Sequence, residues 1–343
     1  MNTDDFLLLL NVFAFVWGAI WGSFLNVVIY RLPEGRSLVH PPSHCPKCKT
    51  PLAWYDNVPI LGWLILRARC RYCKVPIPIR YPMVELLTAI LSLAVWIHVS
   101  HGRLFVGFED PPLLDVGMAF FLYFYFVAIL ITIAFIDFDR TIIPHELTGL
   151  GAVLGLVAAF VMPRSTVLMD IWPMMTWAQA LIGGALGGFV IWGVIKGYAL
   201  VRGIEGMGWG DFTLMAVCGI WLGWQGVVVV LFLASVQGLM AALGHAALLK
   251  ATGRKVSDGG FFIEDVDAVD AWDGTGEPPE EAARQPEEGA EATPVGDGEA
   301  PEAPDEEEEV GFGQLAVPFG PFIALAAVEY LLLGQFILPW ILP

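Results

Sequence analysis

Two aspartates stand at the edges of long apolar segments, where an acidic side chain is energetically costly. Asp137 follows the uncharged run Val116–Ile136, and Asp211 precedes Phe212–Ala247, which contains no Asp, Glu, Lys or Arg. Carboxylates within or at the edge of a membrane indicate function unless a structural role explains them. Two structural roles are open. Asp211 follows a glycine and precedes an apolar run, as a helix N-cap does, and Asp137 and Asp139 fit a solvated helix end.

Together, the two carboxylates predict acid–base chemistry that needs no metal. Carboxylates that lie close together repel each other when both are ionised, which favours their sharing one proton. The ionised group can then activate water while the protonated group polarises a peptide carbonyl, as in aspartic proteases. Three glycines precede Asp211 at alternate positions, and they would allow substrate or a neighbouring helix to approach closely: Gly206, Gly208 and Gly210.

Four cysteines form a second constellation that could do chemistry. Cys45 and Cys48 form one CxxC pair, Cys70 and Cys73 form another, and 21 residues separate the pairs. Four thiolates favour tetrahedral Zn²⁺, and because they leave no open position the metal would be structural. Two disulfides are the alternative, but a reduced cytoplasmic loop would disfavour them. The fifth cysteine, Cys218, is expected to pack in an apolar helix.

The elements that must position these residues are membrane-spanning helices. The chain has 343 residues with 56% hydrophobic residues, a mean hydropathy of +0.65 and 15% charged residues. Apolar runs of about 20 residues, each long enough to cross a bilayer, account for this composition. We therefore expect an all-α polytopic membrane protein with about eight transmembrane helices, at residues 6–30, 82–100, 113–136, 146–162, 175–199, 211–223, 225–249 and 315–341. The short sixth segment and the seventh are expected to form a hairpin near Gly223 and Gly226, and no internal repeat is evident.

The distribution of charge predicts how the chain is oriented. Residues 31–81 carry nine Lys and Arg against two acids, so this loop is expected in the cytoplasm and the N-terminus outside. Alternation of the helices then places Asp137 and Asp211 on the same cytoplasmic face. The net charge of −17 comes from residues 256–310, which hold 20 Asp and Glu and one basic residue, a composition typical of a disordered loop. No clustered basic surface indicates nucleic-acid binding.

These features predict five parts of the chain. They are a first transmembrane helix, a cytoplasmic four-cysteine loop, a transmembrane core with both aspartates, an acidic disordered cytoplasmic loop and a last transmembrane helix, at residues 1–30, 31–81, 82–250, 251–314 and 315–343. For Asn26, inside the first apolar run, two roles stay open: support of helix packing, or a position near a substrate or cofactor. The Pro and Gly residues at 318–321 would break a helix, which is tolerated beside a cavity.

The order of the motifs resembles that of bacterial prepilin peptidases, the type IV leader peptidases among the GxGD aspartyl proteases. The motifs are GSFLNVVIYRLP (22–33), the two CxxC pairs, RYPMVE (80–85), IDFDRTIIP (136–144), GMGWGDFTL (206–214) and VPFGPF (317–322). The resemblance implies that Asp137 and Asp211 are the catalytic pair of an inner-membrane endopeptidase. Its substrates would be type IV prepilins or type II secretion pseudopilins, held against the lipid bilayer.

The resemblance also implies a second activity, which the residues alone do not indicate. Members of this type methylate the new N-terminal residue with S-adenosylmethionine, and the sequence does not locate that cofactor's site. Two positions depart from the family pattern: His145 stands where Asp or Asn is frequent, and Thr213 where Lys is common. Neither departure removes a proposed catalytic group.

Two other functions remain open on the sequence. A transporter could use both carboxylates to bind a cation or relay protons, but it would place them near the middle of the bilayer among polar helices. A non-catalytic assembly component could instead use the cysteine loop for docking. The oligomeric state is not indicated.

Overall fold

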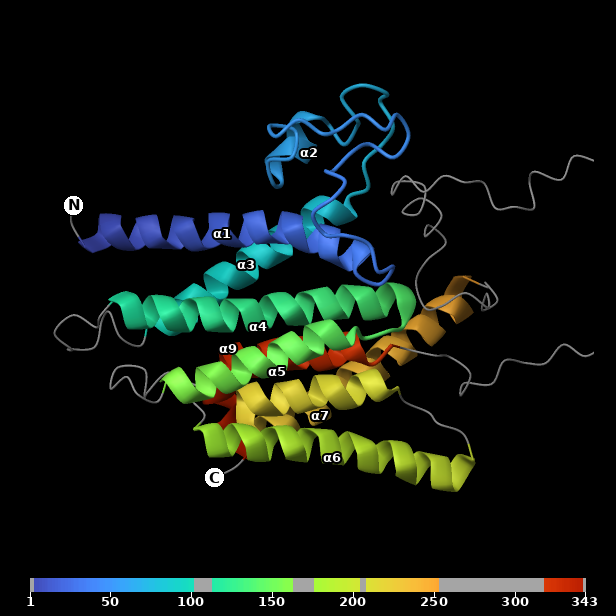
Figure 1. The fold of residues 1–343 in the computed structure, drawn as a ribbon. Helices are drawn as coiled ribbons and strands as arrows, with labels where there is room; N and C mark the ends of the chain where they lie inside the picture. Colours follow the sequence, from blue (N-terminus) through green and yellow to red (C-terminus); the bar gives the residue numbers. More distant parts are fainter. Residues whose placement is uncertain (1–2, 102–112, 163–175, 204–207, 253–317, 342–343) are drawn as a thin grey trace, which may run out of the picture.

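The computed structural model describes residues 3–101, 113–162, 176–203, 208–252 and 318–341 (Figure 1). Within these ranges the chain is all-helical and contains no β-strand. The helices are α1 (Thr3–Arg31), α2 (Leu61–Ile65), α3 (Arg80–His101), α4 (Leu113–Arg140), α5 (His145–Val161), α6 (Trp177–Arg202), α7 (Trp209–Thr252) and α9 (Gly320–Ile341). The acidic segment 256–310, which we expect to be disordered, lies outside the described residues.

The helices have the length and composition of membrane spans. Five of them, namely α1, α3, α4, α6 and α7, are long and apolar enough to cross a bilayer, and α5 and α9 contribute shorter apolar helices. The predicted all-α polytopic membrane fold is thus confirmed for the described residues. The predicted bounds agree within a few residues for most helices, but α4 extends past the expected end at residue 136 to Arg140.

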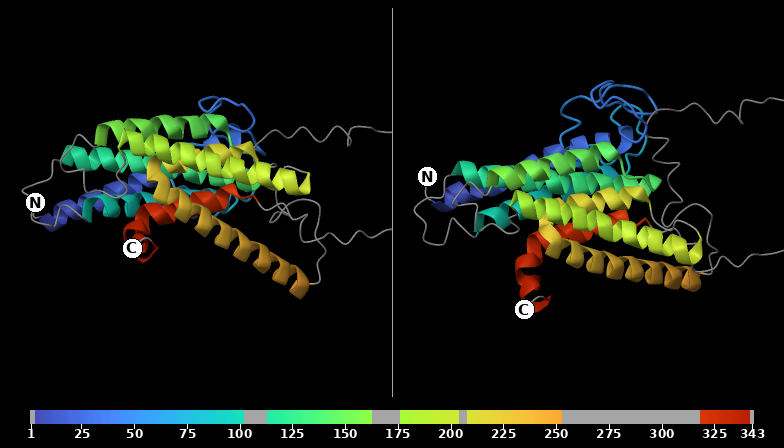
Figure 2. Two further views of the ribbon diagram at one scale, coloured as in Figure 1. Left: turned by 90° about the horizontal axis from the view of Figure 1, so that it is seen from below. Right: turned by 60° about the horizontal axis from the view of Figure 1, so that its bottom comes forward.

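Helix α7 contains both the sixth and seventh predicted segments. Its 44 residues would measure about 66 Å as one straight helix, about twice the hydrocarbon thickness of a bilayer. Gly223 interrupts it with φ 70° and ψ −177°, a conformation that other residues rarely adopt. Figure 2 shows the two halves of α7 diverging from a sharp bend, with the second half leading away from the bundle. The expected change of direction therefore occurs at Gly223.

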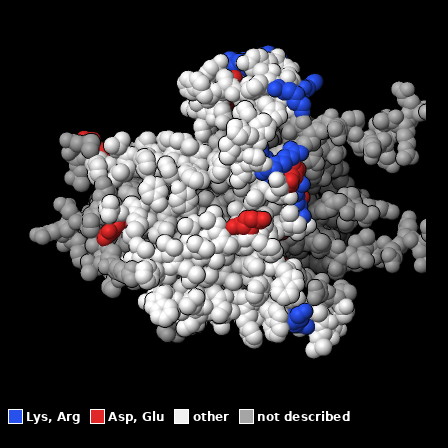
Figure 3. Space-filling model, in the orientation of Figure 1, with Lys and Arg blue, Asp and Glu red and all other residues white. Residues whose placement is uncertain are grey.

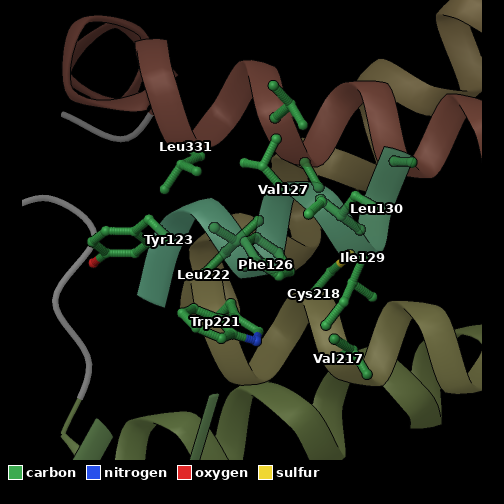
Figure 4. Packing of buried hydrophobic residues seen from close by; sticks show 14 of the residues in the cluster. Tyr123, Phe126, Val127, Ile129, Leu130, Val217, Cys218, Trp221, Leu222 and Leu331 are labelled. Atoms are coloured by element: carbon green, nitrogen blue, oxygen red, sulfur yellow. The ribbon is translucent and has the colours of Figure 1, made fainter. Parts of the chain in front are cut away.

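Helix α4 lies at the centre of the bundle, between the α1–α3 pair and helices α5, α7 and α9 (Figure 1). Its uncharged sequence explains this position, because a helix that is apolar all round is stable only when surrounded by lipid or protein. Phe126 stacks on Trp221 of α7 with ring centroids 4.7 Å apart, and Figure 4 shows both rings in the core with Tyr123 and Leu130. The Trp221 indole donates to the Gly151 carbonyl of α5 at 2.9 Å.

Small residues allow the helices to pack closely. Gly183 of α6 faces Gly219 of α7, and a Cβ at either position would overlap the backbone of the other. Gly18 and Gly22 of α1 similarly lie against the backbone of α3. Because lipid tails are as apolar as the helices, such close backbone contact is a main source of attraction between membrane helices.

Basic side chains gather at one end of the bundle. Arg31 ends α1, Arg80 begins α3 and Arg140 ends α4, and the cysteine loop connects α1 to α3 at this same end. On the face in Figure 3, Lys and Arg lie over the cysteine loop and this end, while the body of the bundle is almost free of charge. We call this end of the bundle the basic end.

The α6–α7 contact generates a prediction about stability. Gly183→Ala should lower the free energy of unfolding by about 1–3 kcal/mol, because the added methyl group meets fixed backbone. Gly193→Ala in the same helix is the matched control, since a Cβ there has no neighbour within 4 Å. Thermal unfolding of the two purified variants in detergent measures the difference, and equal midpoints would contradict the packing described.

Candidate active site

Asp137 lies in the last turn of α4 and is buried, with 6% of its surface exposed. The helix continues beyond it, and Thr141 donates its backbone N–H to the Asp137 carbonyl at 2.8 Å. Gly320, the first residue of α9, donates its N–H to Asp137 Oδ2 at 3.0 Å. The positive end of the α9 dipole therefore points at this carboxylate. A solvated helix end does not describe Asp137, although Asp139, two residues later, is partly exposed.

Asp211 lies in the first turn of α7 and is also buried, with 9% of its surface exposed. The helix begins at Trp209, so Asp211 is inside it and does not occupy the N-cap position. Its backbone N–H donates to the Gly208 carbonyl at 3.2 Å. The N-cap interpretation therefore does not account for the carboxylate.

The structure brings both aspartates to the basic end. Their carboxylates are close enough for direct electrostatic repulsion. Ile143, in the segment between α4 and α5, packs against Gly210 just before Asp211 and against Gly320, the residue that binds Asp137. One side chain thus joins the two acidic positions across three segments of the chain.

The glycines before Asp211 have different roles. A Cβ on Gly210 would lie 2.7 Å from the Ile143 Cβ, so only glycine fits without displacement. A Cβ on Gly208 would have open space, with its nearest neighbour 3.8 Å away. Gly206 lies outside the described residues. The sequence suggested that all three glycines allow close approach of a neighbouring segment. The structure confirms this for Gly210 and not for Gly208.

Two ion pairs beside the aspartates were not predicted from the sequence. Arg80, at the start of α3, pairs with Asp139, and Arg140 pairs with Glu34 after α1 at 2.6 Å. They tie the last turn of α4 to the α1–α3 pair. The family departures lie close by in the chain: His145 begins α5, and the Thr213 hydroxyl donates to the Gly210 carbonyl at 2.9 Å.

The four cysteines lie together as the spacing predicted. All four sulfurs are within 4.8 Å of one another, with Cys45–Cys73 at 3.6 Å and Cys48–Cys70 at 4.0 Å. Four thiolates around tetrahedral zinc, with Zn–S bonds of about 2.3 Å, would be about 3.8 Å apart. None of the four forms a disulfide. The donor set and its geometry therefore fit zinc.

The two halves of the cysteine cluster are built alike. In the first half, the backbone N–H of Lys49 donates to the Cys45 carbonyl and that of Cys45 donates to the Thr50 carbonyl. In the second half, the backbone N–H of Lys74 donates to the Cys70 carbonyl and that of Cys70 donates to the Val75 carbonyl. The matching sequences, CPKCKTP (45–51) and CRYCKVP (70–76), share the pattern C-x-x-C-K-x-P. A short internal repeat is therefore present, and the expectation of no internal repeat was wrong.

Burial raises the pKa of the Cys45 thiol to about 12. This thiol would therefore keep its proton at neutral pH without a nearby cation. Metal ions bind the deprotonated form, so a bound divalent cation would displace this proton.

Comparison with known proteins assigns both regions. Residues 16–99 match the bacterial peptidase A24 N-terminal domain, and residues 124–243, which include both aspartates, match the type IV leader peptidase family. A prepilin leader peptidase/N-methyltransferase of Myxococcus xanthus is 37% identical over 97% of this chain and 92% of its own length.

This chain belongs to the type IV leader peptidase family. Relatives with the same name from Klebsiella pneumoniae and Aeromonas hydrophila are 37% and 36% identical over 65% and 67% of this chain, and over 90% and 79% of their own lengths. No solved structure matches. Together with its apolar helices, this relationship makes the protein a multi-pass membrane protein of this peptidase family.

The packing of Ile143 generates a prediction about the site. Gly210→Ala should force Ile143 away from its place and lower the free energy of unfolding by about 1–3 kcal/mol. Gly208→Ala, two residues earlier, should leave stability nearly unchanged because its methyl group meets open space. Thermal unfolding of both variants in one detergent is the measurement, and equal loss in both would contradict the role of Ile143.

Proposed function

We propose that this protein is a membrane-embedded aspartyl endopeptidase that removes the leader peptide from prepilins and methylates the new N-terminal residue. The substrates are type IV prepilins or type II secretion pseudopilins. The single observation that carries the proposal is the pair of buried aspartates, Asp137 and Asp211, held together at the basic end within the region that matches the peptidase family.

The two carboxylates divide the work of peptide hydrolysis. One, ionised, takes a proton from water as the water oxygen attacks the scissile carbonyl carbon. The other, protonated, gives its proton to the carbonyl oxygen. When the tetrahedral intermediate collapses, the carbon–nitrogen bond breaks and the leaving amine takes up a proton. The Gly320 N–H holds Asp137 in place, so this carboxylate is oriented before substrate binds.

The position of the aspartates suits a substrate with a basic leader and an apolar helix. Such a chain would leave its leader in the cytoplasm and its helix in the bilayer, so the bond between them lies at the membrane edge. The aspartates lie at the end of the bundle where Arg31, Arg80 and Arg140 gather, and basic residues favour the cytoplasmic side. We therefore place the active site at the cytoplasmic face of the bacterial inner membrane, with the N-terminus outside.

Two cofactors belong to the proposal. Zn²⁺ is held by Cys45, Cys48, Cys70 and Cys73 as a structural ion, since the four sulfurs leave it no open position. S-Adenosylmethionine supplies the methyl group for the second activity, which the relatives' name includes. A transporter is not favoured, because the relatives carry the name of a peptidase and the aspartates lie at the end of the bundle.

Replacement of either aspartate should abolish cleavage. Asp137→Asn and Asp211→Asn remove an ionisable group that transfers a proton, so we expect the rate to fall about 10²–10⁴-fold or further. Co-expression with a prepilin, followed by the gel shift on leader removal, is the measurement. Asp115→Asn, at the opposite end of α4, is the matched control and should cleave as wild type does. Normal cleavage by both site variants, with intact folding, would exclude the pair.

The zinc proposal predicts metal content. Purified protein should contain about one zinc per chain, and Cys48→Ser or Cys70→Ser should lose most of it, because three thiolates bind zinc less tightly than four. Cys218→Ala is the control, since Cys218 lies in the α7 core away from the cluster. Elemental analysis by mass spectrometry measures the metal. Wild-type protein purified without chelators and found free of zinc would refute the assignment.

A further inference from the structure

A cavity of about 220 Å³ lies between the cysteine loop and the adjoining ends of α1 and α3. A single buried water needs only about 10–15 Å³, so the cavity is large enough for a small organic molecule. Its lining comes from the last turns of α1, from the first turn of α3 and from the loop on both sides of the first CxxC pair. All of these residues fall within the region that matches the N-terminal family domain. Neither Asp137 nor Asp211 lines it.

A buried carboxylate lines this cavity. Glu85 of α3 is 9% exposed and accepts a hydrogen bond from the Ile60 N–H at 2.6 Å, and Ser23 of α1 provides a second hydrogen bond. Gly22 allows α1 to lie directly against the Glu85 backbone. Within the described part of the chain, no Lys or Arg forms an ion pair with this carboxylate. Burial of such a group is costly, and a cationic ligand would offset the cost.

The wall of the cavity offers further groups to a ligand. The Tyr30 hydroxyl is buried and has no hydrogen-bond partner among the described residues. Buried hydroxyl groups usually have a partner, so this one is an unsatisfied polar group on a residue that lines the cavity. Trp63 and Tyr81 add aromatic surface, and Asn26 donates to the Tyr81 carbonyl at 3.1 Å and holds α1 to α3. Both roles left open for Asn26 are compatible with this place, because it joins the two helices and also lines the cavity.

Basic groups complete the lining. Arg31 donates to the carbonyls of Ser37 and Pro41, at 3.1 and 2.8 Å, and so fixes the loop that closes one side. The Arg36 guanidinium lies over the Tyr30 ring, 5.8 Å from its centre, and pairs with Glu34 at 2.8 Å. The cavity thus combines the Glu85 carboxylate, a second buried carboxylate, Asp56, which pairs with Arg71, aromatic surface and two guanidinium groups. A ligand that fits this lining carries a positive centre, an aromatic ring and a carboxylate.

We propose that this cavity binds S-adenosylmethionine, the methyl donor of the second activity. The donor has a sulfonium and an ammonium group for Glu85, an adenine ring for the aromatic surface and a carboxylate for the arginines. The inference rests on the proposed methylation and adds the place where it begins. It also gives the cysteine loop a role in binding the methyl donor, because that loop forms the outer wall of the cavity.

The cavity lies beside the peptidase site. Arg80, directly before the lining residue Tyr81, pairs with Asp139, two residues after Asp137. This pair joins the turn that carries Asp137 to the helix end that lines the cavity, so a peptide amine released at the aspartates is at the same end of the bundle as the cavity. The amine nitrogen forms a bond to the donor's methyl carbon, the carbon–sulfur bond breaks and the sulfur keeps the electron pair. The amine's surplus proton leaves to water, so the step balances.

Direct binding tests the proposal without depending on turnover. Full-length protein in lipid nanodiscs is titrated with S-adenosylmethionine by calorimetry. Glu85→Gln keeps the shape and removes the charge, and we expect Kd to rise about tenfold or more. Tyr30→Phe removes only the hydroxyl and should raise Kd about threefold. Ser92→Ala is the control, because Ser92 is buried on the same helix and bonds to Ala14 away from the cavity.

Cross-linking gives a second readout if Glu85→Gln does not fold. Ultraviolet cross-linking of radiolabelled S-adenosylmethionine to wild type should label peptides within residues 23–85. Label confined to 177–252, or unchanged affinity in both cavity variants, would overturn the location. Wild type that cleaves prepilin but binds no S-adenosylmethionine would overturn this inference and leave the peptidase intact. Wild type that does not cleave would instead contradict the proposed function itself.

Discussion

The site depends on the way buried carboxylates at a membrane edge obtain polar partners from the protein. Asp137 receives one from the backbone of α9, whose first residue, Gly320, donates its N–H at 3.0 Å. That approach requires glycine, because a Cβ there would press on the carboxylate and on Ile143. Ile143 in turn requires glycine at position 210. The relative positions of Asp137 and Asp211 therefore rest on backbone contact at two glycines, and larger residues at either would separate the pair.

Much of this arrangement follows from local patterns in the sequence. Apolar runs are long enough to reveal the helices. Because successive helices alternate in direction, their number alone predicts that Asp137, Asp211 and the cysteine loop lie at one end of the bundle, as they do. The meeting of the four cysteines can also be predicted, because each CxxC pair places two thiols close together by its spacing alone. The bend at Gly223 can also be predicted, because a glycine within an apolar run too long for one membrane span allows the chain to change direction. Placement in the cytoplasm and the disorder of the acidic loop stay predictions.

The other contacts of the site could not be predicted from the sequence, because they join residues that are distant in the chain. The bond from Gly320 to Asp137 spans 183 positions, and the Arg80–Asp139 pair spans 59. Local propensity also gave the wrong end for α4, since Asp137 looks like a terminus after Ile136. In the structure its carboxylate is buried by α9, so the helix continues to Arg140. An acid near the start of a helix, such as Glu85, is ordinary in sequence because it interacts favourably with the helix dipole. Only the approach of α1 and of Ile60 shows that it is enclosed.

Two activities at one end of one bundle have a physical rationale. Cleavage creates a charged amine on an apolar helix at the membrane edge, and any enzyme that modifies this amine must meet it at the same depth. The Arg80–Asp139 and Arg140–Glu34 pairs join the last turn of α4 to the α1–α3 pair, so they connect the segment that carries Asp137 to the helices that line the cavity. The product can then be modified at the end of the bundle where it is formed, whereas separate enzymes would have to bind the buried helix a second time. The cysteine loop covers the cavity from outside the membrane, where a soluble cofactor can reach it.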